Sequence, residues 1–198
     1  YATKNITTGE GGMVTTSDPG IAERVRLLRN HGQKERYHHA LLGYNLRMTE
    51  MQGALGLVQL EKLERFTEQR IANAAFLTER LRGSVQTPVV RSGYRHVYHQ
   101  YTIRVPEYRD EWVKHLRARG IGTAVHYPLA VHQQPFYREH PGKFIFAPET
   151  TRAERTTADI RLPVTELAAK QVLSLPVHPA LSMEELATIV KEVRTLCD

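Results

Sequence analysis

Apolar residues recur at helical spacing along much of the first half of the chain. Asp18 and Pro19 favour a helix start, because aspartate can cap free N–H groups and proline suits the first helical position. Thr49 and Gln52 have the spacing of a capping box and predict a second helix, which a third follows over residues 66–82. The first half is therefore predicted to be mainly helical.

Short runs rich in β-formers and runs of alternating polarity predict strands between these helices and beyond them. The predicted strands cover residues 11–16, 98–105, 121–125 and 173–177. Further helices are predicted over residues 110–119 and 165–172, and from Ser182, where Glu185 completes another capping box. Residues 126–164 are rich in proline and histidine and are predicted to be largely irregular. We expect an α/β protein with two domains, residues 1–87 and 88–198.

Composition narrows the class of protein. The chain has 198 residues, of which 41% are hydrophobic and 24% charged, so it resembles an ordinary globular protein. Its single cysteine, Cys197, excludes an internal disulfide. No apolar run reaches the roughly 18–20 residues of a membrane span. The N-terminus has no secretory pattern, so a cytoplasmic setting without membrane contact is the expectation.

Positive charge is concentrated in one part of the chain. Lys and Arg together number 27, against 21 Asp and Glu. The stretch from Arg24 to Arg47 has several basic residues and only one acidic residue, Glu35. Such a local field suits an anionic ligand, although a solvated face is the commoner explanation of a charge run. A basic nucleic-acid-binding module is the third possibility, but the aromatic residues do not alternate with the basic ones as a base-stacking surface requires.

Three places along the chain combine residue types that carry chemistry. Lys4 stands just before a polar, glycine-rich turn, where backbone amides can approach a phosphate closely. Asn45 and Arg47 immediately precede a capped helix, and helix N-termini bind anions. His126 and Tyr127 lie in a proline-stiffened loop after a strand. Spacing alone leaves a surface lysine, a simple cap and an ordinary loop as alternatives, and no cluster of donors indicates a metal site.

Taken together, these stretches resemble the DegT/DnrJ/StrS family of sugar aminotransferases. The residues that carry the resemblance include Lys-Asn-Ile-Thr-Thr-Gly-Glu-Gly-Gly over 4–12, Arg-Asn-His-Gly over 29–32, and the stretch over 43–56. Others are Tyr-His-Gln-Tyr over 98–101, the stretch over 120–128 with His-Tyr-Pro at its end, His-Gln-Gln-Pro over 132–135, and Leu-Pro-Val-His-Pro over 175–179. The family uses pyridoxal 5′-phosphate (PLP) and has the fold-type-I transferase architecture. The resemblance implies the end of the large domain followed by the small C-terminal α/β domain.

The resemblance also assigns roles to the candidate residues. It implies that Lys4 is the catalytic lysine that binds PLP covalently, and that Asn45 binds the cofactor phosphate across a homodimer with shared active sites. Arg47, His126 and Tyr127 would contact the nucleotide-sugar substrate. The implied activity is transfer of an amino group, from glutamate as the donor, to a nucleotide-linked keto-sugar. Relatives that dehydrate sugars have histidine in place of this lysine, so Lys4 favours transamination.

The resemblance places Lys4 near the middle of a family member, so the chain is expected to be a C-terminal part of a longer enzyme. The isolated chain is then expected to be inactive. A catalytically inert fragment, a PLP-dependent sugar dehydratase and, with less support, a nucleic-acid-binding module are the alternatives. For His31 and His132, a structural role and a functional role stay equally open.

Overall fold

The computed structural model describes residues 1–140 and 160–197. These residues form two compact units, residues 1–67 and residues 68–198, and the long helix α2 contributes to both. Part of the segment predicted to be irregular, residues 141–159, lies outside the described residues. The domain boundary at residues 87 and 88 stays a prediction for the whole protein.

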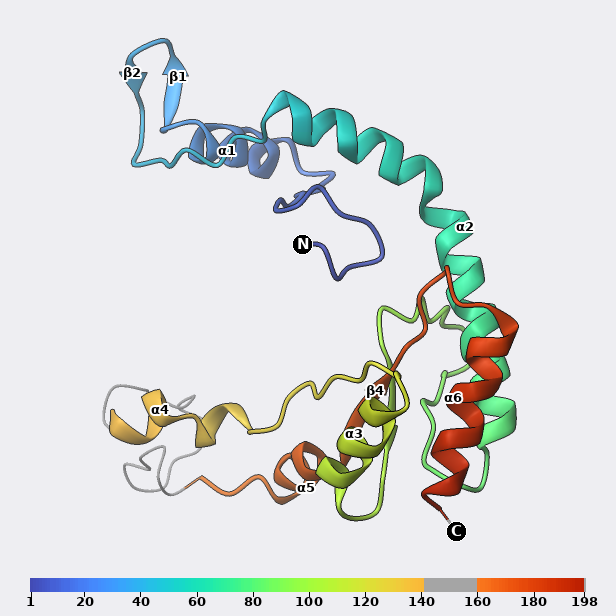
Figure 1. Ribbon diagram of the computed structural model, residues 1–198. Helices are drawn as coiled ribbons and strands as arrows, with labels where there is room; N and C mark the ends of the chain where they lie inside the picture. Colours follow the sequence, from blue (N-terminus) through green and yellow to red (C-terminus); the bar gives the residue numbers. More distant parts are fainter. Residues whose placement is uncertain (141–159, 198) are drawn as a thin grey trace. The chain divides into compact units, whose positions relative to one another are not determined.

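The first unit contains a short helix, a hairpin and the first half of α2 (Figure 1). Helix α1 spans Pro19–Arg29, and the Asp18 carboxylate accepts from the N–H groups of Gly20 and Ile21, as the cap predicts. Strands β1 (Gln33–Glu35) and β2 (His38–His39) pair antiparallel and form the hairpin. The segment after the hairpin leads to α2.

Helix α2 spans Glu50–Leu81 as one continuous helix. Its start confirms the predicted capping box, because Thr49 Oγ1 accepts from the N–H of Gln52, and Gln52 Oε1 accepts from the N–H of Thr49. The prediction of two separate helices was wrong. Nothing near residue 64 stops a helix, since Glu64 and Arg65 are both good helix formers. The helix ends before Gly83, which has a φ of +84°.

The strand predicted over residues 11–16 is not formed. Residues 11–16 have no regular secondary structure and are exposed, although Met13, Val14 and Thr15 favour β structure. A strand is stabilised by hydrogen bonds to a neighbouring strand, and none of the described residues pairs with this segment as one. The preference of these residues is therefore not sufficient by itself.

The second unit is built around a two-stranded antiparallel sheet of β3 (Tyr101–Arg104) and β4 (Val172–Leu175). Helix α3 spans Arg109–Ala118, α5 Pro163–Gln171 and α6 Met183–Thr195, and between α3 and α5 lie the 3-10 turn η1 (Val131–Gln133) and the short helix α4 (Pro135–Glu139). Ser182 and Glu185 form the predicted capping box of α6. The strand predicted over residues 121–125 is reduced to one bridge, Ala124 with Ser174.

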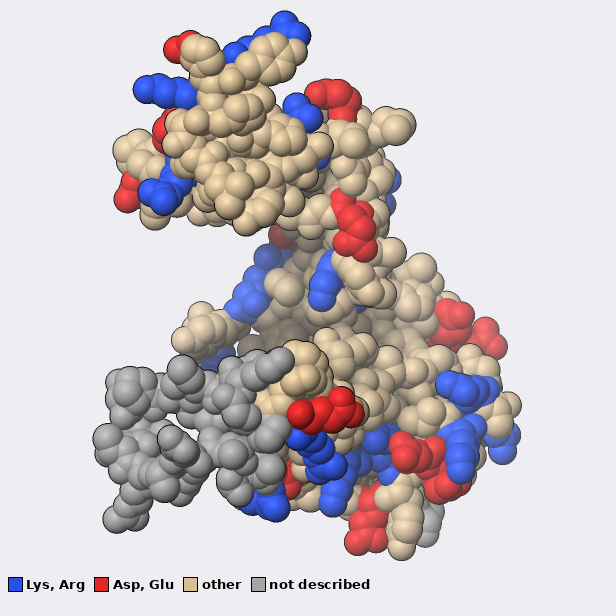
Figure 2. Space-filling model, turned by 90° about the vertical axis from the view of Figure 1, so that its left-hand side faces the viewer, with Lys and Arg blue, Asp and Glu red and all other residues tan. Residues whose placement is uncertain are grey.

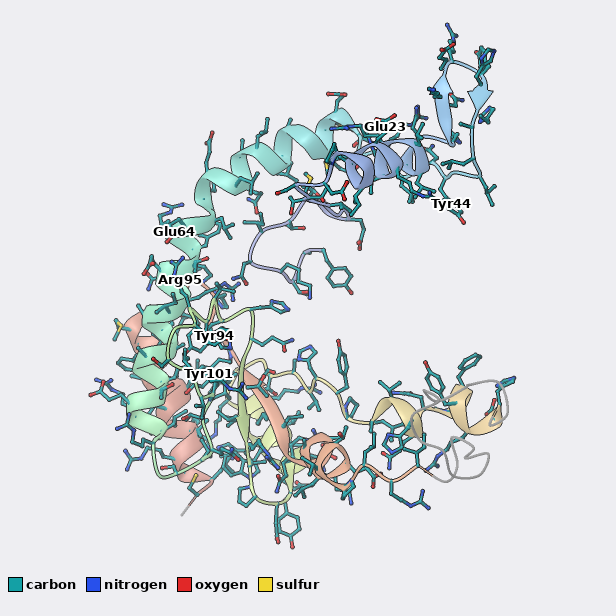
Figure 3. The ribbon with its side chains drawn as sticks, turned by 180° about the vertical axis from the view of Figure 1, so that it is seen from behind. Glu23, Tyr44, Glu64, Tyr94, Arg95 and Tyr101 are labelled. Carbon is teal, nitrogen blue, oxygen red and sulfur yellow. The ribbon has the colours of Figure 1, made fainter. Side chains whose placement is uncertain are left out.

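The buried core lies in the second unit. It is formed by the C-terminal half of α2, the β3–β4 sheet, α3 and α6, and includes the fully buried side chains of Leu77, Tyr101, Leu116 and Val193. Two buried polar side chains of α2 tie other segments to this helix: Arg70 Nη1 donates to the carbonyl of Tyr98, and Asn73 Nδ2 donates to the carbonyl of His178. The tyrosine that begins β3 is labelled in Figure 3.

Apolar side chains are exposed in the first unit. Met51 is 82% exposed and Leu57 is 67% exposed, and both lie in the first turns of α2. In the space-filling view, the upper part of the molecule shows broad areas of uncharged residues between its charged ones (Figure 2). Exposed apolar side chains such as Met51 and Leu57 are typical of an interface with further protein.

Candidate active site

Lys4 lies at the start of an ordered turn in the first unit. The backbone N–H of Lys4 donates to the carbonyl of Tyr1 at 3.2 Å, and its side chain is exposed. The turn that follows is closed by Thr7 Oγ1, which accepts from the N–H of Gly9 at 3.0 Å. Gly9 has a φ of +85°, a conformation that glycine adopts without strain.

Contacts with α2 fix the position of this turn. The N–H of Thr7 donates to Gln59 Oε1 at 3.2 Å, and Gln52 Nε2 donates to the carbonyl of Glu10 at 2.9 Å. Gly56 also lies against the turn: a Cβ on this residue would be 3.2 Å from the side chain of Thr8. The backbone on the C-terminal side of Lys4 is therefore anchored to a helix.

Asn45 and Arg47 form a joined pair just before α2. Arg47 Nε donates to Asn45 Oδ1 at 3.0 Å, and both side chains are exposed. Because Arg47 occupies the amide oxygen, Asn45 presents its Nδ2 group, which is a donor. The pair therefore combines an amide donor with a guanidinium group close to a helix N-terminus, a combination suited to an anion.

Backbone pairing with the end of α1 positions this pair. The N–H of Tyr44 donates to the carbonyl of Leu28, and the N–H of Leu46 donates to the carbonyl of Arg29. Tyr44 is labelled beside α1 in Figure 3. The segment before Asn45 also passes close to Gly32, where a Cβ would lie 1.8 Å from the carbonyl oxygen of Leu41. Asn45 is thus held by two backbone hydrogen bonds that flank it.

His126 and Tyr127 lie in the second unit, directly after the bridge between Ala124 and Ser174. His126 Nδ1 is 3.4 Å from Ser174 Oγ. The two rings meet edge to face, with centroids 5.6 Å apart, and both side chains are exposed. The structure therefore brings Asn45 together with Arg47 and His126 together with Tyr127, while Lys4 stands in its own turn.

His31 and His132 have identifiable structural contacts. The carbonyl of His31 lies 2.8 Å from His39 Nδ1, and His31 itself has a φ of 57° in the turn after α1. The His132 ring is 2.9 Å from Glu166 Oε1. Hydrogen bonds from the Leu162 N–H and then from His132 hold the pKa of Glu166 below its usual value. His132 therefore links η1 to α5.

These residues fit PLP in the chemistry of their groups. Lys4 supplies an exposed primary amine, the group that condenses with an aldehyde, on a backbone that is held in place. Asn45 and Arg47 supply donors for a phosphate. No group of three metal-binding side chains occurs within residues 1–140 and 160–197, and no helix in that part of the chain is long and apolar enough to cross a membrane.

Sequence reasoning did not find the hydroxyl groups behind His126. Thr102 Oγ1 and Ser174 Oγ are 2.9 Å apart, and Ser174 Oγ in turn faces His126. One signal was available in the sequence: Ser174 is a polar residue between two leucines in a strand that is otherwise apolar. Its partners lie far away along the chain, so the sequence could not identify them.

Comparison with known proteins shows the family to which this chain belongs. Residues 1–194 match the family described as the DegT/DnrJ/EryC1/StrS aminotransferase family. The chain therefore belongs to this family, which confirms the resemblance drawn from the sequence.

Two curated relatives match almost the whole chain. The chain is 40% identical to the "Pleiotropic regulatory protein" of Geobacillus stearothermophilus, over 98% of this chain and 49% of that protein. It is 38% identical to dTDP-3-amino-3,4,6-trideoxy-alpha-D-glucose transaminase of Streptomyces venezuelae, over 98% of this chain and 48% of that protein. The chain thus spans about half the length of the curated relatives it matches.

A solved structure shows the same fold. The crystal structure of S. venezuelae DesV in complex with a ketimine intermediate matches with a TM-score of 0.79 and 36% identity. The match covers 93% of this chain and 46% of that one. This likeness confirms the predicted fold class, an α/β aminotransferase fold.

Proposed function

We propose that the whole protein is a PLP-dependent aminotransferase that transfers an amino group from glutamate to a nucleotide-linked keto-sugar. The observation that carries the proposal is Lys4: an exposed amine on an anchored turn, in a chain that belongs to an aminotransferase family. Membership in this family and the transaminase from S. venezuelae support a nucleotide-sugar substrate.

Lys4 has two tasks in this proposal. Its Nζ would hold PLP in the site through the aldehyde group of the cofactor, with loss of water. The same amine, once free, would take the proton from the Cα of the amino donor, and in the second half of the reaction it would give a proton to the sugar carbon that gains the amino group. PLP supplies the electron sink that makes this Cα acidic. The anchored turn keeps Nζ within reach for both tasks.

The remaining residues bind and orient. Asn45 Nδ2 donates to the cofactor phosphate of the partner subunit in a cytoplasmic homodimer, and Arg47 adds charge beside the same phosphate or that of the sugar nucleotide. His126 and Tyr127 contact the sugar. A lysine rather than a histidine at residue 4 supports transamination over dehydration. In this proposal, the exposed apolar residues of α2 lie at interfaces with the rest of the enzyme.

Transfer of labelled nitrogen tests the proposal. The whole protein, of which this chain is a part, is incubated with PLP, ¹⁵N-glutamate and the 3-keto counterpart of the S. venezuelae transaminase product, and the sugar nucleotide is analysed by mass spectrometry. We expect a ¹⁵N-amino sugar with the wild type and with Lys191→Ala, a variant of an exposed lysine in α6, and none with Lys4→Ala. A sugar that has lost water and gained no nitrogen would instead identify a dehydratase.

A further inference from the structure

Ser174 is a buried polar residue in an apolar strand. It lies in β4 between Leu173 and Leu175, and only 7% of its surface is exposed. A buried hydroxyl group is costly unless it is hydrogen-bonded. Thr102 lies opposite Ser174 in β3, and the two hydroxyl oxygens are 2.9 Å apart. This contact alone would satisfy one hydrogen bond of Ser174, and a hydroxyl group can make more.

The second neighbour of the Ser174 hydroxyl is His126. The backbones of Ala124 and Ser174 exchange two hydrogen bonds, of 3.2 and 2.8 Å, which fix the chain two residues before His126. The His126 ring then reaches back, with Nδ1 3.4 Å from Ser174 Oγ, while the side chain as a whole is exposed. Among the described residues no hydrogen bond engages His126 Nε2. One ring nitrogen is thus directed to the sheet and the other to the surface.

We infer that Ser174 is a positioning residue: its hydroxyl, supported by Thr102, holds His126 by Nδ1 and directs Nε2 to the sugar. This inference rests on the proposed function, which places His126 against the substrate. It extends that proposal by naming the group that orients the ring and the nitrogen that contacts the ligand.

The physical reason is the ambiguity of a neutral imidazole. Either ring nitrogen can carry the proton, and the ring can rotate by half a turn, so an unanchored histidine presents a mixture of donors and acceptors. A hydrogen bond to one nitrogen selects a ring orientation and a tautomer for the other, as in metal sites where an outer partner orients a ligating histidine. Ordering the ring before the sugar binds removes part of the entropy loss on binding.

The test compares four proteins: the wild type, Ser174→Ala, Thr102→Val and Thr78→Val. Thr78→Val is the matched control, because it removes another half-buried hydroxyl in the same unit, 2.9 Å from Tyr101 Oη, without touching His126. The first readout is the ¹⁵N NMR spectrum of the His126 ring without cofactor or substrate. The second is the KM for the keto-sugar nucleotide against the KM for glutamate.

We expect Ser174→Ala to shift the His126 ¹⁵N resonances toward the averaged values of a histidine with two tautomers. We expect it to raise the KM for the sugar roughly threefold to tenfold, the range that one neutral hydrogen bond accounts for. Thr102→Val should produce a smaller change in the same direction. The KM for glutamate should stay constant in all four proteins, and Thr78→Val should leave the His126 resonances in place.

Two results would overturn the inference. The first is an unchanged His126 spectrum in Ser174→Ala, which would mean that the hydroxyl does not hold the ring. The second is a shifted spectrum with an unchanged KM for the sugar, which would mean that the sugar does not depend on the orientation of the ring. If the wild type transfers no nitrogen at all, the proposed function fails, whereas the NMR readout still decides whether Ser174 orients His126.

Discussion

Replacing Tyr101 by phenylalanine should change the stability of the protein in a way that depends on pH. Tyr101 is the first residue of β3, its side chain is fully buried, and its hydroxyl lies 2.9 Å from Thr78 Oγ1. The pKa of Tyr101 is raised from 10.0 to about 12, mainly by burial; the hydrogen bond with Thr78 lowers the pKa, and the nearby Tyr98 raises it. The substitution therefore has two opposing effects on the free energy of unfolding.

The first effect acts at neutral pH. Tyr101→Phe removes the hydrogen bond to Thr78, and we expect the free energy of unfolding to fall by about 1 kcal/mol. The second effect acts in alkali. In the wild type, the contribution of the buried neutral phenol is complete below pH 10 and is lost as the pH rises to about 12. The pKa shift of about two units, at about 1.36 kcal/mol per unit, corresponds to a total loss of about 2.7 kcal/mol of stability.

The stability difference between the two proteins should therefore change sign. By about pH 11 the wild type has lost about 1.4 kcal/mol of this contribution, which exceeds the hydrogen bond that the variant lacks. Denaturant unfolding of both proteins at a series of pH values between 7 and 11 measures the difference directly. Tyr108→Phe is the control, since that side chain is 76% exposed and its removal should leave the curve unchanged. A constant difference across this range would refute the reasoning.

Three further predictions concern other parts of the chain. Gly32→Ala should lower thermal stability more than Gly83→Ala does. Both glycines have positive φ, but only at Gly32 does a backbone oxygen stand where the added Cβ would lie. Equal losses in thermal unfolding would contradict this. The N–H of Ser182, the cap residue of α6, donates to the Glu185 carboxylate and lowers its pKa. The stabilising effect of this hydrogen bond is present above pH 4.5 and is lost as the pH falls. Glu185→Gln should therefore show a weaker acid dependence in urea unfolding, and parallel pH curves would argue against this effect. Mixing Asn45→Ala subunits with Lys4→Ala subunits should restore about a quarter of wild-type activity, because about half of the dimers are mixed and each has one intact site. No recovery would show that Asn45 does not act across the dimer.

The sequence was sufficient where structure depends on near neighbours. The capping boxes of Thr49 with Gln52 and Ser182 with Glu185 join side chains three residues apart, so the spacing alone predicted both helix starts. The α5 and α6 helices and the β3 and β4 strands were also found close to where they were expected. These elements follow from local patterns that the surrounding fold does not override.

Long-range partners could not be predicted in the same way. Residues 11–16 have the composition of a strand, but strand formation depends on a neighbour that no local pattern reveals. Ser174 is 72 residues from Thr102 and 48 residues from His126 along the chain, so only the fold brings the three together. The pairing of Asn45 with Arg47, by contrast, involves near neighbours, and the sequence had already singled out both residues.

The central claim is that Lys4 holds the cofactor, and the most direct measurement is to fix that link chemically. The whole protein is loaded with PLP, reduced with borohydride, digested and mapped by mass spectrometry. We predict a pyridoxyl group on the peptide that contains Lys4, and no specific label in Lys4→Ala. A pyridoxyl group on any other lysine of the wild type, with Lys4 unmodified, would contradict the account.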